Sequence, residues 1–108
     1  MENEHELKFR EDCPMIYTLS IVSGKWKWII LFLLSKYGML RYGELKNKVQ
    51  VIAHRTLSQQ LKELEDSDII HREQYNQIPP KVEYSLTDKG KTLIPIMKLM
   101  SQWGQENG

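Results

Sequence analysis

The sequence contains a single cysteine, Cys13, and lacks any long uncharged hydrophobic run. One cysteine excludes an internal disulfide framework and is typical of a reducing compartment. The densest apolar stretch, from Trp26 to Leu34, is interrupted by Lys27 and is about half as long as a membrane-spanning helix needs to be. Residues 1–12 are polar and lack the apolar stretch of a secretory signal. We therefore expect a soluble, intracellular protein with no membrane partner.

The residue patterns that carry catalysis or bind metal ions are also missing. No metal-ligand spacing joins Cys13 to the three histidines, which are His5, His54 and His71. Gly24-Lys25 is not a phosphate loop, because Leu19 stands where glycine is required and Trp26 where Ser or Thr is required. No Gly-x-Ser-x-Gly nucleophile elbow occurs. The sequence therefore indicates neither an enzyme nor a metal or cofactor site.

Length and charge indicate one domain with an uneven charge distribution. A chain of 108 residues fits a single domain, and a core this small gains buried surface by association with a second copy. The formal net charge is +1, yet residues 24–62 carry eight Lys or Arg against Glu44 alone, a local charge of +7. Acidic residues follow directly: Glu63, Glu65, Asp66 and Asp68. This segregation favours a polyanionic partner, although charge alone is equally compatible with a solvated basic surface that binds nothing.

Hydrophobic periodicity predicts helices in the first part of the chain and strands after residue 68. We expect helices at 14–22, 25–35, 42–49 and 53–66, with a brief extended piece at 39–41. Because residues 25–35 are apolar almost all round, that helix should be buried on most faces. Strands at 69–75 and 81–86 flank a loop whose two prolines stop the strand ladder. Thr87 should cap a final helix that Pro95 kinks.

The predicted helix 53–66 has two different faces. Its inward stripe consists of Leu57, Leu61 and Leu64, spaced i, i+4 and i+7. The opposite side, within about 100° of arc, carries groups that hydrogen-bond base edges and phosphates, namely Arg55, Ser58, Gln59 and Lys62. Two helices joined by a tight turn and followed by a β-hairpin predict a winged helix-turn-helix. The expected fold class is α+β, mostly α, with a two- to three-stranded wing sheet and terminal dimerisation helices.

Several short motifs resemble those of HxlR-type regulators, a branch of the MarR-like winged helix-turn-helix transcription factors of bacteria. In chain order they are Cys13-Pro14, Gly24-Lys25-Trp26, Arg41-Tyr42 with Glu44-Leu45, Leu61 to Glu65, and the run from Pro79 to Thr87 (PPKVEYSLT). The resemblance covers residues 13–104. It implies a cytoplasmic homodimer that binds an inverted-repeat operator and represses or activates nearby genes. It also implies that residues 53–66 form the recognition helix and residues 76–81 the wing loop.

Three positions depart from the usual residues of that family. Ala53 replaces the serine that usually precedes His54, so a helix cap worth about 1 kcal/mol is lost or moves elsewhere. Asp68 replaces a glycine but still tolerates a left-handed turn, and Ser23 replaces a glycine-like position. None of these departures argues against the fold.

We expect DNA contacts from the recognition helix, the helix before it and the wing. Arg55 suits a guanine edge in bidentate fashion, and Gln59 suits adenine. Thr56, Lys46 and Lys48 suit phosphates, while His54 suits either backbone or base. The full expected set is His54, Arg55, Thr56, Ser58, Gln59, Lys62, Lys46, Lys48, Asn76, Gln77 and Lys81.

The two ends of the chain should supply the dimer interface. The final helix carries more apolar side chains than one core-facing stripe needs, which favours packing against a partner, although its methionines could instead line a ligand pocket. The expected interface residues are Met15, Ile16, Leu19, Leu93, Ile96, Met97, Met100 and Trp103. In domain terms we expect an N-terminal arm at 1–12 and one domain at 13–104, with its wing at 69–86 and its dimerisation helix at 87–103.

Cys13 is a candidate redox sensor, and it has an equally plain structural interpretation. In several members of the resembled family the cysteine at this position senses oxidants or electrophiles. Partial positive charge at a helix N-terminus favours the thiolate, whereas the neighbouring Glu11 and Asp12 oppose it. The other interpretation is a small buried residue near the interface.

One alternative belongs to a different functional class. A winged helix used for protein–protein contact, with no role in DNA binding, predicts an acidic or apolar recognition face. The Arg, Ser, Gln and Lys side chains of helix 53–66 argue against it.

Overall fold

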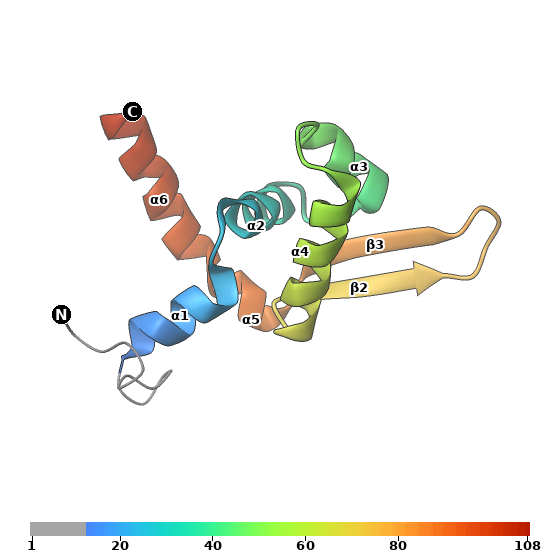
Figure 1. Ribbon diagram of the computed structural model, residues 1–108, viewed down its shortest axis with the longest axis horizontal. Helices are drawn as coiled ribbons and strands as arrows, with labels where there is room; N and C mark the ends of the chain where they lie inside the picture. Colours follow the sequence, from blue (N-terminus) through green and yellow to red (C-terminus); the bar gives the residue numbers. More distant parts are fainter. Residues whose placement is uncertain (1–12) are drawn as a thin grey trace.

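The computed structural model describes residues 13–108, which form a helical body with a projecting hairpin (Figure 1). The predicted N-terminal arm, residues 1–12, lies outside the described residues. The elements are α1 (Pro14–Val22), α2 (Lys25–Tyr37), β1 (Met39–Arg41), α3 (Tyr42–Lys48), α4 (His54–Asp66), β2 (Ile70–Tyr75), β3 (Lys81–Leu86), α5 (Asp88–Lys91) and α6 (Ile94–Asn107). This order confirms the predicted winged helix-turn-helix, with α3 and α4 as its two helices and β2–β3 as its wing.

The sheet has three antiparallel strands in the order β1-β3-β2. Leu40 of β1 lies opposite Tyr84 of β3, and Ile70 of β2 lies opposite Leu86. Alternation along β3 turns Tyr84 and Leu86 toward the core, as the sequence pattern predicts. The short strand β1 therefore closes one side of the hairpin and fixes the wing to the helical body.

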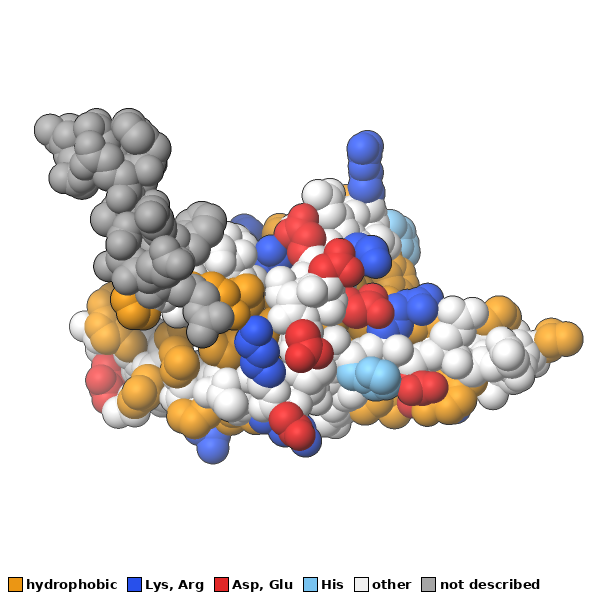
Figure 2. All heavy atoms as spheres, turned by 90° about the horizontal axis from the view of Figure 1, so that it is seen from below, with side chains coloured by type: hydrophobic (Ala, Val, Ile, Leu, Met, Phe, Trp, Pro, Cys, Tyr) orange, Lys and Arg blue, Asp and Glu red, His pale blue; other side chains and the backbone are white. Residues whose placement is uncertain are grey.

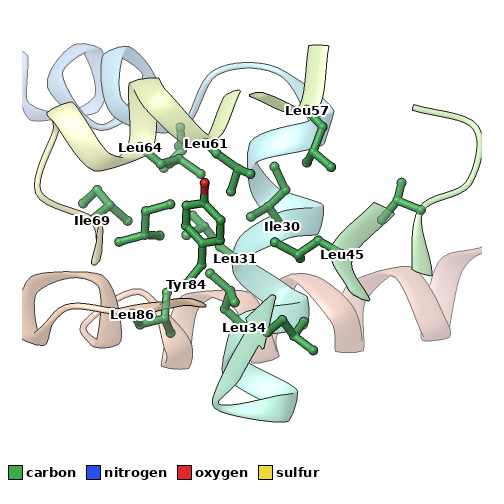
Figure 3. Close-up of a cluster of buried hydrophobic side chains, with 14 of the residues drawn as sticks. Ile30, Leu31, Leu34, Leu45, Leu57, Leu61, Leu64, Ile69, Tyr84 and Leu86 are labelled. Atoms are coloured by element: carbon green, nitrogen blue, oxygen red, sulfur yellow. The ribbon is translucent and has the colours of Figure 1, made fainter. Parts of the chain in front are cut away.

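The core lies between α2, α4 and the base of the sheet (Figure 3). Leu57, Leu61 and Leu64 are all buried, which confirms the predicted inward stripe of α4. They lie in one cluster with Ile30 and Leu31 of α2. Because these contacts hold one side of α4, its opposite side is presented to solvent in a fixed orientation.

The C-terminal part differs from the prediction of one kinked helix. The structure has two helices instead, α5 ending at Lys91 and α6 beginning at Ile94. Thr87 caps α5, where its hydroxyl accepts a hydrogen bond from the Gly90 amide at 3.0 Å. Pro95 lies in the first turn of α6, a position where the missing N–H leaves no helical hydrogen bond unmade. Pro95 therefore starts a helix and does not bend one.

Helix α2 is less buried than its composition predicts. Ile29 and Phe32 are 36% and 41% exposed, because a helix on one side of a small core presents only part of its circumference to that core. Lys27, in contrast, is a charged residue that is only 7% exposed. The prediction that α2 is buried on most faces is therefore wrong for the Ile29–Phe32 face.

The junction of α1 and α2 is a sharp bend. Gly24 adopts φ = 97°, a backbone region that glycine occupies without steric cost, and the two helices are bent by 79°. Taken together, α1 and α2 have the length and composition of a broken membrane span. Within residues 13–108, however, no single helix is long and apolar enough to cross a membrane.

Two of the family departures have visible outcomes. Ala53 is the N-cap of α4 and forms no side-chain cap hydrogen bond. Asp68, in the turn between α4 and β2, has φ = 62°. This confirms that an aspartate accommodates the left-handed turn where a glycine is usual.

Candidate nucleic-acid interface

The exposed side of α4 carries two parallel rows of polar side chains. Residues four apart on a helix lie one above the other, so one row is Arg55, Gln59 and Glu63, and the other is Ser58, Lys62 and Asp66. Arg55, Ser58, Gln59 and Lys62 are all exposed, as predicted. In each row the acidic residue stands nearest the C-terminal end of the helix.

Each row is organised by its acidic member. The Gln59 amide donates a hydrogen bond to Glu63 Oε2 at 3.2 Å, and Lys62 Nζ lies 3.2 Å from Asp66 Oδ1. Among residues 13–108, Arg55 forms no ion pair. Its guanidinium donors are therefore available to a partner in a way that the Lys62 ammonium is not.

A hydrogen-bonded cluster at the start of α4 joins it to α3. The Tyr42 hydroxyl lies 3.0 Å from His54 Nδ1 and 3.2 Å from the His54 carbonyl oxygen. It also accepts a hydrogen bond from the Ser58 hydroxyl at 3.3 Å. The Tyr42 and His54 rings stack, with centroids 5.8 Å apart. Tyr42, which the sequence offered only as part of a motif, therefore positions two predicted site residues.

Lys27 does not belong to the basic surface that the charge pattern predicts. Its ammonium lies 2.6 Å from Glu63 Oε1, and its side chain is 9% exposed. The pKa of the Glu63 carboxyl is lowered from its ordinary value, because Lys27 and, to a smaller extent, Gln59 donate hydrogen bonds to its charged form. Two of the eight cations in segment 24–62, Lys27 and Lys62, are thus paired with carboxylates outside that segment.

The cations of α3 lie beside an aromatic ring and a backbone carbonyl. Lys48 Nζ is 4.2 Å from the Tyr37 ring centroid, and Lys36 Nζ is 5.6 Å from it. Lys46 is half-buried and donates to the Gln50 carbonyl at 3.1 Å. Lys48 and Lys36 are exposed, and a cation over a ring remains accessible to a further anion. Of the two predicted α3 residues, Lys48 is thus the more accessible.

The wing presents neutral polar groups in its loop and a paired cation where the loop meets β3. Asn76 and Gln77 are exposed. Lys81 is half-buried, with Nζ 4.4 Å from the Tyr75 ring centroid and 3.6 Å from Glu83 Oε2. A hydrogen bond with the Glu83 carboxylate raises the pKa of Tyr75. The wing contact predicted for Lys81 therefore competes with an intramolecular pair.

Arg72 is a cation near α4 that the sequence analysis did not single out. It is exposed on β2, opposite Tyr84. Together with Ser58 and Lys62 it lines a polar hollow beside α4, completed by Tyr42, Glu65 and Tyr84. Strand alternation could have indicated this position in the sequence, because Arg72 lies on the same face of β2 as the buried Ile70.

The end of the molecule opposite the wing has a different chemistry. Figure 1 places α1 and α6 there, far from the hairpin, and Figure 2 shows hydrophobic side chains gathered over that end. Apart from Tyr37 at the last residue of α2, the exposed large apolar residues of α1, α2 and α6 are Met15, Leu19, Ile29, Phe32, Ile96, Leu99, Met100 and Trp103. Three of these eight, Ile29, Phe32 and Met100, line a groove of about 310 Å³ between α2 and α6 together with Trp28, Leu33, Met97 and Ser101.

Two residues predicted for the dimer interface pack against the core of their own chain. Met97 is only 4% exposed and is packed in the core of its own chain, and Leu93 is half-buried against that core. Both point inward because they lie on the side of the α5–α6 segment that faces the body. Of the predicted α6 residues, Ile96, Met100 and Trp103 are therefore the exposed ones.

The comparisons with known proteins agree with this geometry. The family model described as HxlR-like helix-turn-helix matches residues 21–108. The chain belongs to the HxlR-like helix-turn-helix family. It is 55% identical over 102 residues to MalR of Fusobacterium mortiferum, named as a regulatory protein, covering 94% of this chain and 96% of MalR.

Two further relatives show how much of the chain is shared. The HTH-type transcriptional regulator BH0655 of Halalkalibacterium halodurans is 47% identical over 106 residues, covering 98% of this chain and 94% of BH0655. The redox regulator HypR, solved in its oxidized form, superposes with a TM-score of 0.84 at 46% identity, covering 89% of this chain and 98% of that one. The resemblance to HxlR-type regulators found in the sequence is confirmed.

Cys13 of this HxlR-like protein stands at the start of α1. It is the N-cap residue and is half-buried. Its carbonyl oxygen accepts a hydrogen bond from the Ile16 amide at 2.9 Å. Among residues 13–108, no group of three His, Cys, Asp or Glu side chains is arranged to hold a metal ion. Cys13 therefore places a thiol at the N-terminal end of α1.

Proposed function

We propose that this protein is a sequence-specific transcriptional regulator that acts in the cytoplasm as a homodimer on an inverted-repeat operator. The observation that carries the proposal is the exposed polar face of α4. Arg55, Ser58 and Gln59 lie near its N-terminal end, which is the end that enters the major groove in helix-turn-helix proteins. The positive pole of the helix dipole lies at the same end and favours phosphates.

Each residue of this face has a specific role in the proposal. Arg55, free of ion pairs among the described residues, contacts a guanine edge, and Gln59 contacts adenine. Lys48 of α3 and Thr56 contact phosphates. Asn76 and Gln77 at the wing tip reach the neighbouring minor groove. Arg72 and Lys62, beside the polar hollow, add positive charge along the same side.

The homodimer is supported by the apolar end of the molecule. Large side chains such as Leu19, Leu99 and Trp103 are more than half exposed there, and clustered exposed apolar side chains mark interaction sites. Because α1 and α6 lie away from the wing (Figure 1), two copies joined there leave both recognition helices free. A two-fold symmetric pair then matches a two-fold symmetric operator.

A thiol-sensing role for Cys13 is a second part of the proposal. HypR, whose structure superposes on this chain at 46% sequence identity, is a redox regulator. Because this chain has one cysteine, a disulfide requires a second molecule. Two Cys13 thiols of a dimer would lose two protons and two electrons to an oxidant such as diamide; a reactive electrophile would alkylate the thiol instead.

The sensor proposal is tested by DNA affinity under oxidation. We expect diamide or a quinone to change the operator affinity of the wild-type protein and to leave that of Cys13→Ser unchanged. A wild-type affinity that does not respond removes the sensing role while leaving DNA binding intact.

DNA binding is tested first with duplexes of random sequence. Fluorescence anisotropy at about 50 mM and about 200 mM salt should show binding that weakens steeply, since each neutralised phosphate releases counterions. A protein–protein interaction module, the alternative, predicts no such binding. Binding that is absent at low salt would exclude the regulator.

A further inference from the structure

A buried lysine connects the core of the protein to the exposed face of α4. Lys27 lies in α2 between two tryptophans and is 7% exposed. Its ammonium lies 2.6 Å from Glu63 Oε1. The other oxygen of the same carboxylate, Oε2, accepts a hydrogen bond from Gln59 Nε2 at 3.2 Å. These three side chains, the Lys27–Glu63–Gln59 relay, extend from α2 to a side chain on the proposed DNA-facing surface.

Stability alone does not account for a lysine at this position. Removing two charges from water is costly, and apolar residues of similar volume often replace a buried ion pair without loss of stability. The neighbouring positions of α2 are apolar, and Met has nearly the length of Lys, so an apolar residue fits the pattern here. An ammonium at position 27 nevertheless reaches across to α4 and binds one carboxylate there.

The relay restricts the orientation of the Gln59 amide. A carboxylate only accepts hydrogen bonds, so it holds the Nε2 side of the amide and rejects the Oε1 side. One N–H of Gln59 is used by Glu63, which leaves the second N–H and the carbonyl oxygen. These two groups are the pair that a bidentate contact with adenine requires. A flipped amide would place an acceptor where the adenine contact needs a donor.

We infer that Lys27 is a positioning residue for base recognition, which holds Glu63 and thereby sets the preference of Gln59 for adenine at one base pair of each half-site. The inference rests on the proposed function, since it takes Gln59 to contact a base. Lys27 itself contacts no DNA. Lys27 is expected to change the ratio of the affinities for the cognate operator and for an operator altered at that base pair. A lysine that only stabilises the fold would change both affinities by the same factor.

The experiment measures that ratio on a selected operator. Gln59→Ala first identifies the base pair concerned, at which the preference for adenine should fall from about tenfold in the wild type to near one. Lys27→Met should reduce the preference at the same base pair to about threefold, because the carboxylate keeps its hydrogen bond but loses its fixed position. Lys27→Arg, which still pairs with Glu63, should retain the wild-type ratio. Lys91→Met, on α5, is the control for loss of one positive charge.

A double variant keeps the inference testable if Lys27→Met alone does not fold. Lys27→Met/Glu63→Gln removes both charges, and position 63 tolerates the change because its side chain is 42% exposed. A glutamine presents either its oxygen or its nitrogen to Gln59, so both amide orientations become possible. The ratio should then approach that of Gln59→Ala. Thermal unfolding of each variant verifies that it is folded at the assay temperature.

Each result supports or overturns the inference. It is overturned if Lys27→Met and Lys27→Met/Glu63→Gln both keep the wild-type ratio, or if Lys91→Met lowers the ratio as much as these two variants do. If Gln59→Ala changes the preference at no position, the inference fails while DNA binding stands. If the wild-type protein distinguishes no sequences at all, the proposed function fails and the inference falls with it.

Discussion

The two ends of the molecule expose opposite kinds of side chain. The exposed side chains of α4 are polar, and its acidic residues bind neighbouring donors. Glu63 accepts a hydrogen bond from Gln59, and Asp66 pairs with Lys62. Around α1 and α6 the exposed groups include large apolar side chains, with Leu99 66% and Trp103 68% exposed. A single small core lies between the two ends and stabilises both. The difference indicates two separate binding surfaces, one for a polyanion and one for an apolar partner.

The contrast also shows how the two surfaces are held. The polar surface is positioned by hydrogen bonds from Tyr42 and by the pair that Lys27 makes with Glu63. The apolar surface needs no such positioning, because burial of hydrophobic area is not directional. Substitutions at the polar end should therefore change specificity, and substitutions at the apolar end should change assembly.

The largest expected effect is at the apolar end. Leu99→Asp should weaken dimerisation by about 3 kcal/mol, about 100-fold, because it places a charge in a desolvated contact. Sedimentation or light scattering should then report a monomer, and operator affinity should fall with it. Ile78→Asp, an equally drastic change at a fully exposed residue of the wing, is the matched control for assembly only: it should keep the dimer mass, although its new charge lies beside Asn76 and Gln77 and should weaken DNA binding. A Leu99→Asp protein with dimer mass would place the interface elsewhere.

The next effect is at the polar end. Arg55→Ala should cost about 1–3 kcal/mol of operator affinity and relax the preference at one base pair of each half-site. Lys48→Ala should instead weaken cognate and random DNA equally and reduce the salt slope by about one. Anisotropy titrations on both DNAs at several salt concentrations separate these outcomes. Equal losses on cognate and random DNA for Arg55→Ala would count against its assignment.

A smaller effect is expected from a single hydroxyl. Tyr42→Phe removes the hydrogen bonds to His54 and Ser58 but keeps the ring. Operator affinity should fall about fivefold, in line with about 1 kcal/mol for such hydrogen bonds. Tyr37→Phe, which alters an exposed tyrosine of α2, is the control. If both variants bind as the wild type does, the cluster does not position α4.

The smallest effect concerns acid stability. The folded protein holds the pKa of Glu63 below its ordinary value, so the stabilisation is present above that ordinary value and is lost as the pH falls through the lowered one. Because the Glu63 side chain is 42% exposed, the contribution should stay below about 1 kcal/mol. Urea unfolding should show Glu63→Gln less stable than wild type at about pH 7 and equal to it at about pH 3. A gap that persists in acid would show that the charge of Glu63 is not responsible.

The main elements of the fold were predictable because their signals are local. The stripe of Leu57, Leu61 and Leu64 predicted both the helix and its buried face, and the structure confirms both. The alternation of Val82, Tyr84 and Leu86 predicted β3 in the same way. The role of Pro95 was not predictable, because a proline either bends a helix or starts one, and which of the two occurs depends on whether the preceding residues are helical.

The organisation of the candidate site was less predictable because it depends on contacts between distant residues. The sequence placed Lys27 in an apolar helix and Glu63 in an acidic run, but no local pattern pairs them. Tyr42 likewise meets His54 and Ser58 only after α3 and α4 have packed. Surface position follows from periodicity, whereas partner choice follows from tertiary packing.

Selection of bound sequences from a random DNA pool tests the assignment of the two ends most directly. If α4 contacts DNA and the α1–α6 end joins two copies, the enriched sequences should contain two inverted half-sites about 10 base pairs, or a multiple of that, apart centre to centre. Recovery of a pool with no common sequence, or of a single asymmetric site bound by one copy, would contradict that assignment.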